Sequence, residues 1–385
     1  MTKSGSDFPV VGVVGGGQLA RMMQQPAIAL GVQLHVLADS RNDSASQVVH
    51  DVSVGDYRDL DTLRRFADNC DVLTFDHEHV PTDHLHALVD AGVTVRPGPD
   101  ALVFAQDKGL MRDRLAVLGS PVPLWRHVHS ADDVASFATD VGGWPVVIKA
   151  TRGGYDGKGV WVVNDSGGAS EVLSHAQVPG FLVEQLVPFT RELSAMVARS
   201  PSGQAVAYPV VETLQVKGIC REVYAPAPGI SEDHAVEAQQ AALRIAGELG
   251  VVGMLAVEMF DTPDGVMVNE LAMRPHNSGH WGMDGAVTSQ FENHLRAVLD
   301  LPLGDPTALA PFTVMVNILG GDLPDLYPAY LHCMARDPGL KIHVYGKTVK
   351  PGRKVGHVNV VGDDVDSLVE RARHAAAYLR GDIDE

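Results

Sequence analysis

The chain has 385 residues, of which 45% are hydrophobic and 20% charged, so it can bury a large core in two or three domains. A formal net charge of −18 argues against a nucleic-acid-binding protein or a membrane-surface protein, because both of those partners are polyanionic.

Three cysteines, Cys70, Cys220 and Cys333, are scattered along the chain, and no Cys-x-x-Cys pair occurs. This spacing favours free thiols over a disulfide framework or a zinc site. The sequence also has no basic and apolar leader, and no apolar run near the ~18 residues of a membrane helix. We therefore expect a cytoplasmic protein that does not span a membrane.

Short apolar runs alternate with helical stretches over residues 9–107, in the order PVVGVV, QLARMMQQPAIALG, VQLHVLAD, LDTLRRFADNC and DVLTFD. This rhythm predicts a parallel α/β sheet, and we assign residues 1–107 to a first domain. A helical connection over residues 101–118 leads into the next domain.

A glycine-rich loop follows the first strand of that sheet. Gly15 to Ala20 fit the pattern G-x-G-x-x-A, and Asp39 ends the next strand, as in a dinucleotide-binding fingerprint. However, such a loop offers backbone N–H groups that bind any phosphate or carboxylate. The loop alone therefore leaves three readings open: an NAD site, another anion site, and tight strand-to-helix packing.

Residues 108–310 read as a second domain, with a mixed sheet and a lid-like subdomain over about 126–190. Lys149 ends the apolar strand Val146–Ile148, and the glycine-rich stretch Gly153–Gly159 follows closely. A lysine beside a glycine loop places a point charge and backbone donors around a polyphosphate. The alternative is a solvated lysine beside a hairpin turn.

A second part of this nucleotide site is predicted downstream of the lid loop. Glu184 and Glu192 flank the extended segment Gln185–Val187. The segment can offer backbone groups to a flat adenine, and the two carboxylates can bind its amino group or the ribose.

Two later strands, Ala256–Phe260 and Met267–Leu271, flank the turn Thr-Pro-Asp-Gly. If Phe260 faces Val268, then Glu258 lies opposite Glu270. Opposed like charges destabilise a sheet unless they are neutralised, and Mg²⁺ binds one or two carboxylates. This predicts a magnesium site, whereas a slip of one residue would separate the two carboxylates onto opposite faces.

The stretch NELAMRPHNSGHW, residues 269–281, holds the densest set of polar side chains. Because Pro275 and Gly279 favour a loop over a helix, we expect His276 and His280 to face a ligand and not the core. Residues 311–385 read as a largely β third domain with a closing helix, Val365–Leu379. Its basic cluster is a candidate phosphate receptor, or else a solvated turn: Lys341, Lys347, Lys350, Arg353 and Lys354.

Four motifs together resemble one family over nearly the whole chain: GVVGGGQLARMM, KATRGGYDGKGVW, VEMF with VNELAMRPHNSGHW, and KPGRKVGH. They are similar to the N5-carboxyaminoimidazole ribonucleotide synthetases of the ATP-grasp superfamily. Related formyltransferases share the third motif as far as Arg-Pro-His and differ after it. The resemblance implies an α/β and α+β chain with three parts: a Rossmann-like pre-ATP-grasp domain without a dinucleotide, an ATP-grasp domain and a small β-rich C-terminal domain.

The resemblance also implies the site residues. ATP would contact Lys108, Lys149, Tyr155, Asp156, Gly157, Lys158, Gly159, Val160, Trp161, Glu184, Gln185, Leu186, Val187, Glu192, Gln215, Asn269 and Glu270. Glu258 and Glu270 would bind two Mg²⁺ ions, for which Mn²⁺ could substitute. The ribonucleotide would contact Gly16, Gly17, Gln18, Leu19, Glu78, Tyr155, Arg274, His276, Asn277 and Ser278, with its phosphate near Lys347, Arg353 and Lys354. Lys149, Tyr155, Arg274 and His276 would act in catalysis. The chain departs from the family at Asp76, often a glutamate, and at Gln215, often a histidine.

The implied activity is the ATP- and bicarbonate-dependent carboxylation of 5-aminoimidazole ribonucleotide, through carboxyphosphate, in de novo purine biosynthesis. A homodimer that passes its product to a separate mutase is also implied. Two other functions stay open: a formate-dependent glycinamide ribonucleotide transformylase, and an NAD-binding protein built on Gly15 to Ala20.

Overall fold

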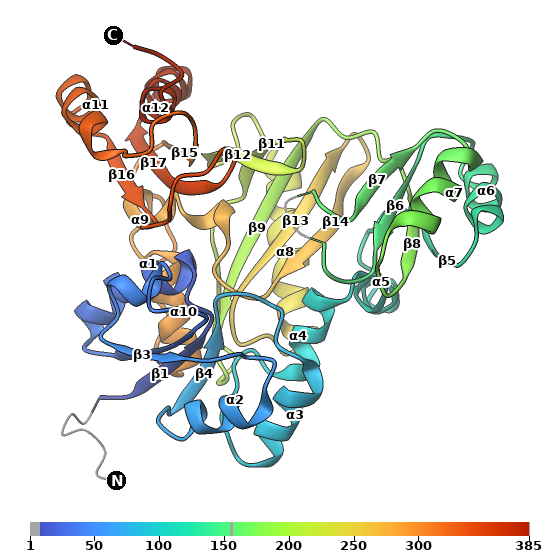
Figure 1. Ribbon diagram of the computed structural model, residues 1–385. Coiled ribbons are helices and arrows are strands. Elements are labelled where there is room, and N and C mark those ends of the chain that lie inside the picture. The colour runs from blue at the N-terminus through green and yellow to red at the C-terminus, as the bar shows by residue number, and fades with distance from the viewer. Residues whose placement is uncertain (1–7, 155–156, 385) are drawn as a thin grey trace.

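The computed structural model describes residues 8–154 and 157–384. It contains three β-sheets (Figure 1). The N-terminal sheet and the lid lie at opposite ends of the molecule, and a large sheet runs between them.

The N-terminal sheet is parallel, with strand order β3-β2-β1-β4, as the alternating pattern predicts. Its strands are β1 (Val10–Val14), β2 (Gln33–Ala38), β3 (Asp51–Val54) and β4 (Val72–Phe75). Its helices are α1 (Gln18–Leu30), α2 (Leu60–Ala67), α3 (Thr82–Asp90) and α4 (Pro99–Gln106). Helix α1 begins directly after the glycine loop and ends at Gly31, whose φ of 71° suits a residue without a side chain.

The lid is a four-stranded sheet with the order β5-β8-β6-β7, and it is antiparallel throughout, not mixed as predicted. It comprises β5 (Trp125–Val128), β6 (Val146–Ala150), β7 (Val160–Val163), β8 (Phe181–Gln185), α6 (Ala131–Asp140) and α7 (Ser166–His175). The two helices cover one face, where Phe137, Ile148 and Val183 form a small core. The other face is left for the site.

The large sheet has nine antiparallel strands in the order β14-β13-β9-β11-β12-β15-β17-β16, with β10 beside β9. They are β9 (Arg191–Arg199), β10 (Ala205–Ala207), β11 (Val211–Val216), β12 (Ile219–Ala225), β13 (Gly253–Thr262), β14 (Gly265–Ala272), β15 (Phe312–Leu319), β16 (Lys341–Val344) and β17 (Lys354–Gly362). Because β12 pairs with β15, the C-terminal strands extend the sheet of the middle segment and do not form a sheet of their own.

The remaining helices are α5 (Lys108–Val117), α8 (Glu232–Glu248), α9 (Gly282–Gly285), α10 (Gln290–Val298), α11 (Tyr330–Arg336) and α12 (Val365–Arg380). Three short 3-10 helices also occur, at Ala45–Gln47, Asn277–Gly279 and Tyr327–Ala329. Helix α10 begins after Ser289, whose side chain caps it by accepting from the Glu292 N–H. Helix α11 lies in a segment predicted as β. In the described part of the chain, no helix is both long and apolar enough to cross a membrane.

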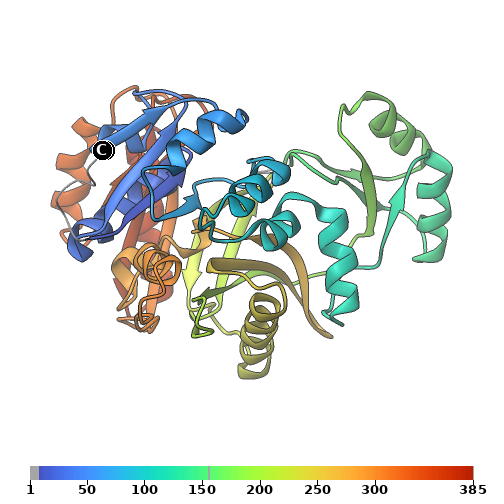
Figure 2. The same ribbon diagram turned by 90° about the horizontal axis from the view of Figure 1, so that it is seen from below.

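The N-terminal sheet lies side by side with the C-terminal strands (Figure 2). Three hydrogen bonds join these distant segments: Ser44 Oγ to the Tyr345 carbonyl at 2.5 Å, Gln47 Nε2 to the Gly346 carbonyl at 2.7 Å, and Lys347 Nζ to Gln18 Oε1 at 2.6 Å. The glycine loop and the basic C-terminal segment therefore meet.

Candidate active site

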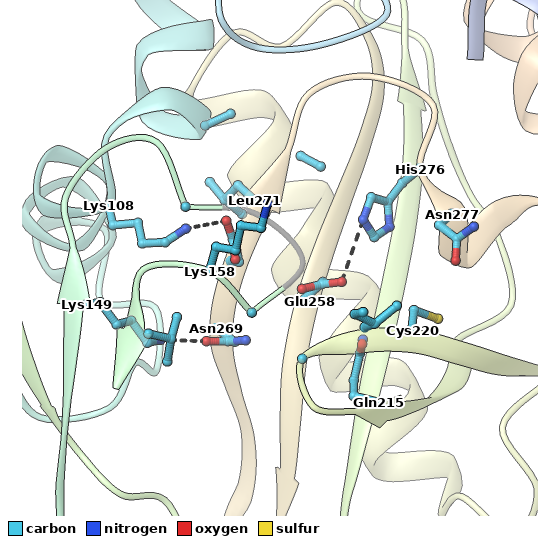
Figure 3. A pocket seen from close by; sticks show the side chains of 18 of the residues that line it. Lys108, Lys149, Lys158, Gln215, Cys220, Glu258, Asn269, Leu271, His276 and Asn277 are labelled. Atoms are coloured by element: carbon cyan, nitrogen blue, oxygen red, sulfur yellow. Dashed lines mark hydrogen bonds and ion pairs between the residues drawn. The ribbon is translucent and has the colours of Figure 1, made fainter. Parts of the chain in front are cut away.

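A cavity of about 1160 Å³ is lined by residues from the large sheet, the lid and the loops of the N-terminal sheet. Figure 3 shows it from close by. Most of the predicted site residues line it: Gly17, Gln18, Leu19, Glu78, Lys108, Lys149, Gly157, Lys158, Val160, Glu184, Gln185, Leu186, Val187, Glu192, Gln215, Glu258, Asn269, Glu270, Arg274, His276, Asn277, Lys347, Arg353 and Lys354. Segments far apart in the sequence thus form one site.

Four predicted residues lie outside this set of described lining residues. Gly16 lines a smaller adjoining cavity of about 500 Å³. Trp161 packs into the lid core beside Phe181, with ring centroids 6.3 Å apart, while Val160 and Val162 face the cavity. Gly159 lies in the lid turn, and Ser278 is buried behind the wall. The predicted contacts of Tyr155 and Asp156 fall outside the described residues.

A β-bulge arranges the acidic end of the cavity. Glu258 pairs with Glu270 as predicted, but Met259 pairs with Val268 and Phe260 with Met267, so the predicted pairing of Phe260 with Val268 is wrong. Asn269 is the extra residue. Neighbours in a regular strand face opposite sides, whereas the bulge lets both Asn269 and Glu270 face the cavity.

Two lysines hold these bulge residues from the other side of the cavity (Figure 3). Lys108, the first residue of α5, donates to Glu270. Lys149 donates to Asn269 Oδ1 at 2.9 Å and pairs with Glu184 at 2.7 Å. Glu184 is only 2% exposed, and its ion pair positions Lys149 at the cavity wall. Burial lowers the pKa of Lys149, and Glu184 counteracts that effect.

Arg112 is a residue of this region that the motifs do not reveal. Its Nε donates to Glu184 Oε1 at 2.7 Å, and one NH2 hydrogen goes to the Asn269 carbonyl at 2.8 Å. One sequence signal could have indicated Arg112: it lies four residues after Lys108 in a predicted helix, a spacing that places both side chains on the same helix face.

The acidic side chains carry opposite pKa shifts. Burial, reinforced by Glu270 and Glu192, raises the pKa of Glu258 to about 7. Burial also opposes ionisation of Glu270, but Lys108, Lys149 and Arg112 together outweigh it and lower the pKa of that carboxyl. Burial raises the pKa of Glu192 to about 7. The cavity therefore contains carboxyl groups that a further positive charge would stabilise.

These groups fit a magnesium ion. Glu258 and Glu270 supply hard oxygen ligands, and they are opposed across one strand pair. The described residues form no cluster of three or more His, Cys, Asp or Glu ligands. Mg²⁺ completes its shell with water and substrate phosphates, so two carboxylates can suffice to hold it.

His276 is held firmly at the opposite wall. The backbone N–H of His276 donates to Gln290 Oε1, and its backbone carbonyl accepts from Gln290 Nε2, both at 2.8 Å. The Ser278 N–H donates to Nδ1 at 3.4 Å, so the proton of the neutral ring is assigned to Nε2. Nε2 lies 3.6 Å from Glu258 Oε1. Burial, with Arg274 and Lys354 nearby, lowers the pKa of His276 to about 3.

His280 corrects the prediction that both histidines of this loop face a ligand. It is fully buried, and Gln290 Nε2 approaches its Nδ1 at 2.9 Å. Its ring packs among Phe291, Tyr345 and His357. The loop turns through a 3-10 helix directly into α9, which carries His280 into the core.

The side of the cavity that holds Arg274 and Asn277 is fixed by paired side chains. Arg274 Nε donates to Glu78 Oε2 at 2.8 Å. Burial lowers the pKa of the guanidinium, but Glu78, with Asp76 and Glu270, outweighs burial and raises it. Asn277 and Asn317 exchange amide hydrogen bonds of 3.1 and 2.7 Å. Arg274 and Asn277 are therefore held in fixed orientations.

The glycine loop closes the far end. The Ala20 N–H donates to Asp76 Oδ1 at 2.8 Å, and a Cβ on Gly17 would lie 2.0 Å from Asp76 Oδ2. A glycine is therefore required at position 17. Lys347 and Arg353 lie beside this loop. The predicted basic cluster is therefore divided: Lys347, Arg353 and Lys354 line the cavity, whereas Lys341 and Lys350 are not among the described residues that line it.

Comparison with known proteins agrees with the architecture. Family models match as follows: ribonucleotide synthetase preATP-grasp domain over residues 9–106, ATP-grasp domain over 113–291, and phosphoribosylaminoimidazole carboxylase C-terminal domain over 313–371. These matches confirm the predicted fold class.

Named relatives cover nearly the whole chain. The N5-carboxyaminoimidazole ribonucleotide synthase of Mycobacterium leprae is 55% identical over 96% of this chain and 89% of its own length. The synthetase structure from Thermus thermophilus has a TM-score of 0.87 at 36% identity, covering 97% and 99% of the two chains. An Aspergillus clavatus synthase structure, in complex with ADP and 5-aminoimidazole ribonucleotide, has a TM-score of 0.88 at 31% identity, again covering 97% and 99%. The chain belongs to the N5-carboxyaminoimidazole ribonucleotide synthase family.

Proposed function

We propose that this protein is an ATP-dependent carbon–nitrogen ligase of de novo purine biosynthesis. It uses ATP and bicarbonate to convert 5-aminoimidazole ribonucleotide into N5-carboxyaminoimidazole ribonucleotide, with release of ADP and phosphate. The single observation that carries this proposal is the shared cavity. Its acidic and lysine-rich wall suits nucleotide phosphates, and its Arg274 and His276 wall suits a carboxyl group beside an anionic substrate.

The nucleotide half of the cavity lies between the lid and the large sheet. Lys108 and Lys149 approach from α5 and β6, and Leu186, Val187 and Phe189 offer apolar and backbone surface for a base. Phe189 stacks on Phe260 with centroids 4.7 Å apart. The Aspergillus clavatus relative, solved with ADP, supports nucleotide binding here.

Glu258 and Glu270 would hold Mg²⁺, and the family resemblance implies that two ions bind. Bound there, it would neutralise the two carboxylates and the charge on the transferring phosphoryl group. The opposed carboxylates and the raised pKa of Glu258 support this assignment.

The ribonucleotide would lie across Glu78, Arg274 and Asn277, with its phosphate between the glycine loop and Lys347 and Arg353. Gly17 and Gln18 line the cavity at the start of α1, where an anion would be favoured, while the Ala20 N–H already donates to Asp76. The 2.6 Å hydrogen bond from Lys347 to Gln18 supports a single phosphate subsite built from both ends of the chain.

In the first step, a bicarbonate oxygen attacks the γ-phosphorus of ATP, and the bond to the β-phosphate oxygen breaks to release ADP. Lys149 would stabilise the charge on the transferring group. The amine then attacks the carboxyl carbon of carboxyphosphate, phosphate leaves, and the nitrogen loses a proton. Arg274 would stabilise the carboxyl oxygens, and His276, with its proton on Nε2, would orient them by donation.

The other two candidate functions are not favoured. The relatives from Mycobacterium leprae and Corynebacterium ammoniagenes, 55% and 48% identical, carry the synthase name. The glycine loop faces the basic residues of the phosphate subsite, which leaves the NAD reading without a supporting observation. The homodimer, the separate mutase and the cytoplasmic location stay predictions.

The test is ADP release by the purified protein with Mg²⁺ and ATP, in the presence and absence of bicarbonate and of 5-aminoimidazole ribonucleotide. We expect turnover only with all components. Turnover that does not depend on the ribonucleotide would reject the proposal.

A further inference from the structure

Arg112 is a charged side chain with no exposed surface, one turn after Lys108 on α5. A buried guanidinium is costly unless its donors are used. Two of its nitrogens make the hydrogen bonds to Glu184 and to the Asn269 carbonyl, and NH1 has no partner among the described residues. Apolar residues of similar volume can often replace a whole buried ion pair without loss of stability, so the pair by itself is weak evidence for a purely stabilising role.

The two partners of Arg112 belong to different sheets. Glu184 lies on β8 in the lid, and Asn269 is the bulge residue of β14 at the edge of the large sheet. Each partner in turn contacts Lys149, through the ion pair with Glu184 at 2.7 Å and the hydrogen bond to Asn269 at 2.9 Å. Arg112, Glu184, Lys149 and Asn269 thus form a closed ring that spans both sheets.

Arg112 stands behind the cavity wall. The described residues that line the cavity include Glu184, Lys149 and Asn269, but not Arg112 itself. Arg112 is therefore placed to act on a bound nucleotide by positioning these three residues and not by direct contact.

We propose that Arg112 is a positioning residue for the nucleotide half of the site: it joins the lid to the bulge of β14 and thereby fixes where Lys149 and Asn269 meet ATP. This inference rests on the proposed function for the identity of the nucleotide. The planar fork of arginine suits the role, because one guanidinium reaches a carboxylate and a carbonyl on separate strands. A lysine presents one nitrogen and cannot occupy both positions.

The test compares Arg112→Lys, Arg112→Met and a matched control, Arg114→Lys. Arg114 lies on the same helix, is partly exposed and contacts Glu248. The readouts are the Kd of ADP by calorimetry, the KM values of ATP and of the ribonucleotide, and Tm. For both Arg112 variants, we expect the ADP Kd and the ATP KM to rise about 10- to 100-fold. The KM of the ribonucleotide should stay within about twofold, and the control should match the wild type.

A lower Tm with an unchanged ADP Kd and ATP KM would overturn the inference, because Arg112 would then act in stability alone. Equal increases in both KM values would overturn it as well. If Arg112→Met does not fold, Arg112→Lys still decides, since it keeps the charge and removes the fork. ADP binding is measured without turnover, so a protein that binds ADP but ignores the ribonucleotide would reject the proposed function and leave the role of Arg112 testable.

Discussion

The carboxyl groups of Glu258 and Glu270 are paired across β13 and β14, yet their pKa values move in opposite directions. Both line the cavity and are partly exposed to it. Lys108 donates to Glu270 and keeps it ionised, whereas Glu258 faces the negative charges of Glu270 and Glu192. The two carboxyl groups therefore differ before any ligand binds. Lys108 neutralises Glu270, whereas Glu258 would gain most from a bound cation.

Replacement of Glu270 by Gln should abolish ADP formation while the protein stays folded. The substitution keeps the shape of the side chain and removes the charge that Lys108 and the magnesium ion would share. It also removes the repulsion of Glu258, so the fold loses little. Steady-state ADP release and Tm are the measurements.

Glu171→Gln is the matched control, because Glu171 is an exposed residue of the lid helix α7. It should retain wild-type turnover. Normal turnover of the Glu270→Gln variant, with an unchanged dependence on magnesium concentration, would refute the metal assignment.

Lys347→Ala and Arg353→Ala should each raise the KM of the ribonucleotide, by about 10- to 100-fold for the loss of a hydrogen bond to a charged phosphate. The KM of ATP should change far less. Lys350→Ala is the control, since Lys350 is exposed in the same segment and absent from the described cavity wall. Equal effects on both substrates would move the phosphate subsite elsewhere.

Local sequence patterns predict the parallel sheet, the lid strands and the pairing of Glu258 with Glu270, because alternation and glycine spacing are local properties. The bulge at Asn269 is not predictable in this way. Its carbonyl is held by Arg112, which is 157 positions away in the sequence. The predicted register is in error from Met259 onward, and the extra residue falls just after the carboxylate pair, so that pair is still correct.

His280 shows a second limit. Proline and glycine around it predict an exposed loop, but the ring packs against Phe291, Tyr345 and His357, which come from α10 and the C-terminal strands. Burial of a polar residue depends on such distant partners. The short helix α11 is missed for a related reason. Of its seven residues, Cys333 alone is fully buried, so its sequence does not show the repeated apolar positions by which a longer helix is recognised.

Gln290→Met should lower kcat more than it changes either KM. Gln290 holds both the N–H and the carbonyl of His276, so its loss frees the ring that we assign to the carboxyl group. Two backbone groups of His276 lose their partners, which costs about 1–3 kcal/mol each in the free energy of unfolding.

Gln239→Met separates this effect from lost stability. Gln239 donates one hydrogen bond to the Tyr208 carbonyl, at 2.8 Å, from helix α8 outside the described cavity wall. It should lower Tm and leave kcat unchanged. If both variants reduce kcat in proportion to Tm, Gln290 has no specific role in positioning His276.

The stability of the protein should fall as the pH is lowered below about 6.5, partly through His294. This side chain is fully buried, its Nδ1 accepts from the Met254 N–H, and burial lowers its pKa from 6.5 to about 3. The unfolded chain therefore takes up a proton below pH 6.5 that the folded chain takes up only near pH 3. Stability is complete above the unfolded pKa and is lost progressively toward the folded one. Between about pH 7.5 and 5.5, this one histidine should cost about 1.4 kcal/mol.

His280 and His357, whose pKa values are also lowered by burial, act in the same direction. Urea unfolding of the wild type and of His294→Gln at several pH values measures the contribution. Glutamine can accept from the Met254 N–H and donate to Thr74, but it does not titrate. The variant should therefore lose about 1.4 kcal/mol less than the wild type over the same interval. Equal pH dependence in both proteins would mean that His294 takes up its proton without unfolding, and that its burial does not control acid stability.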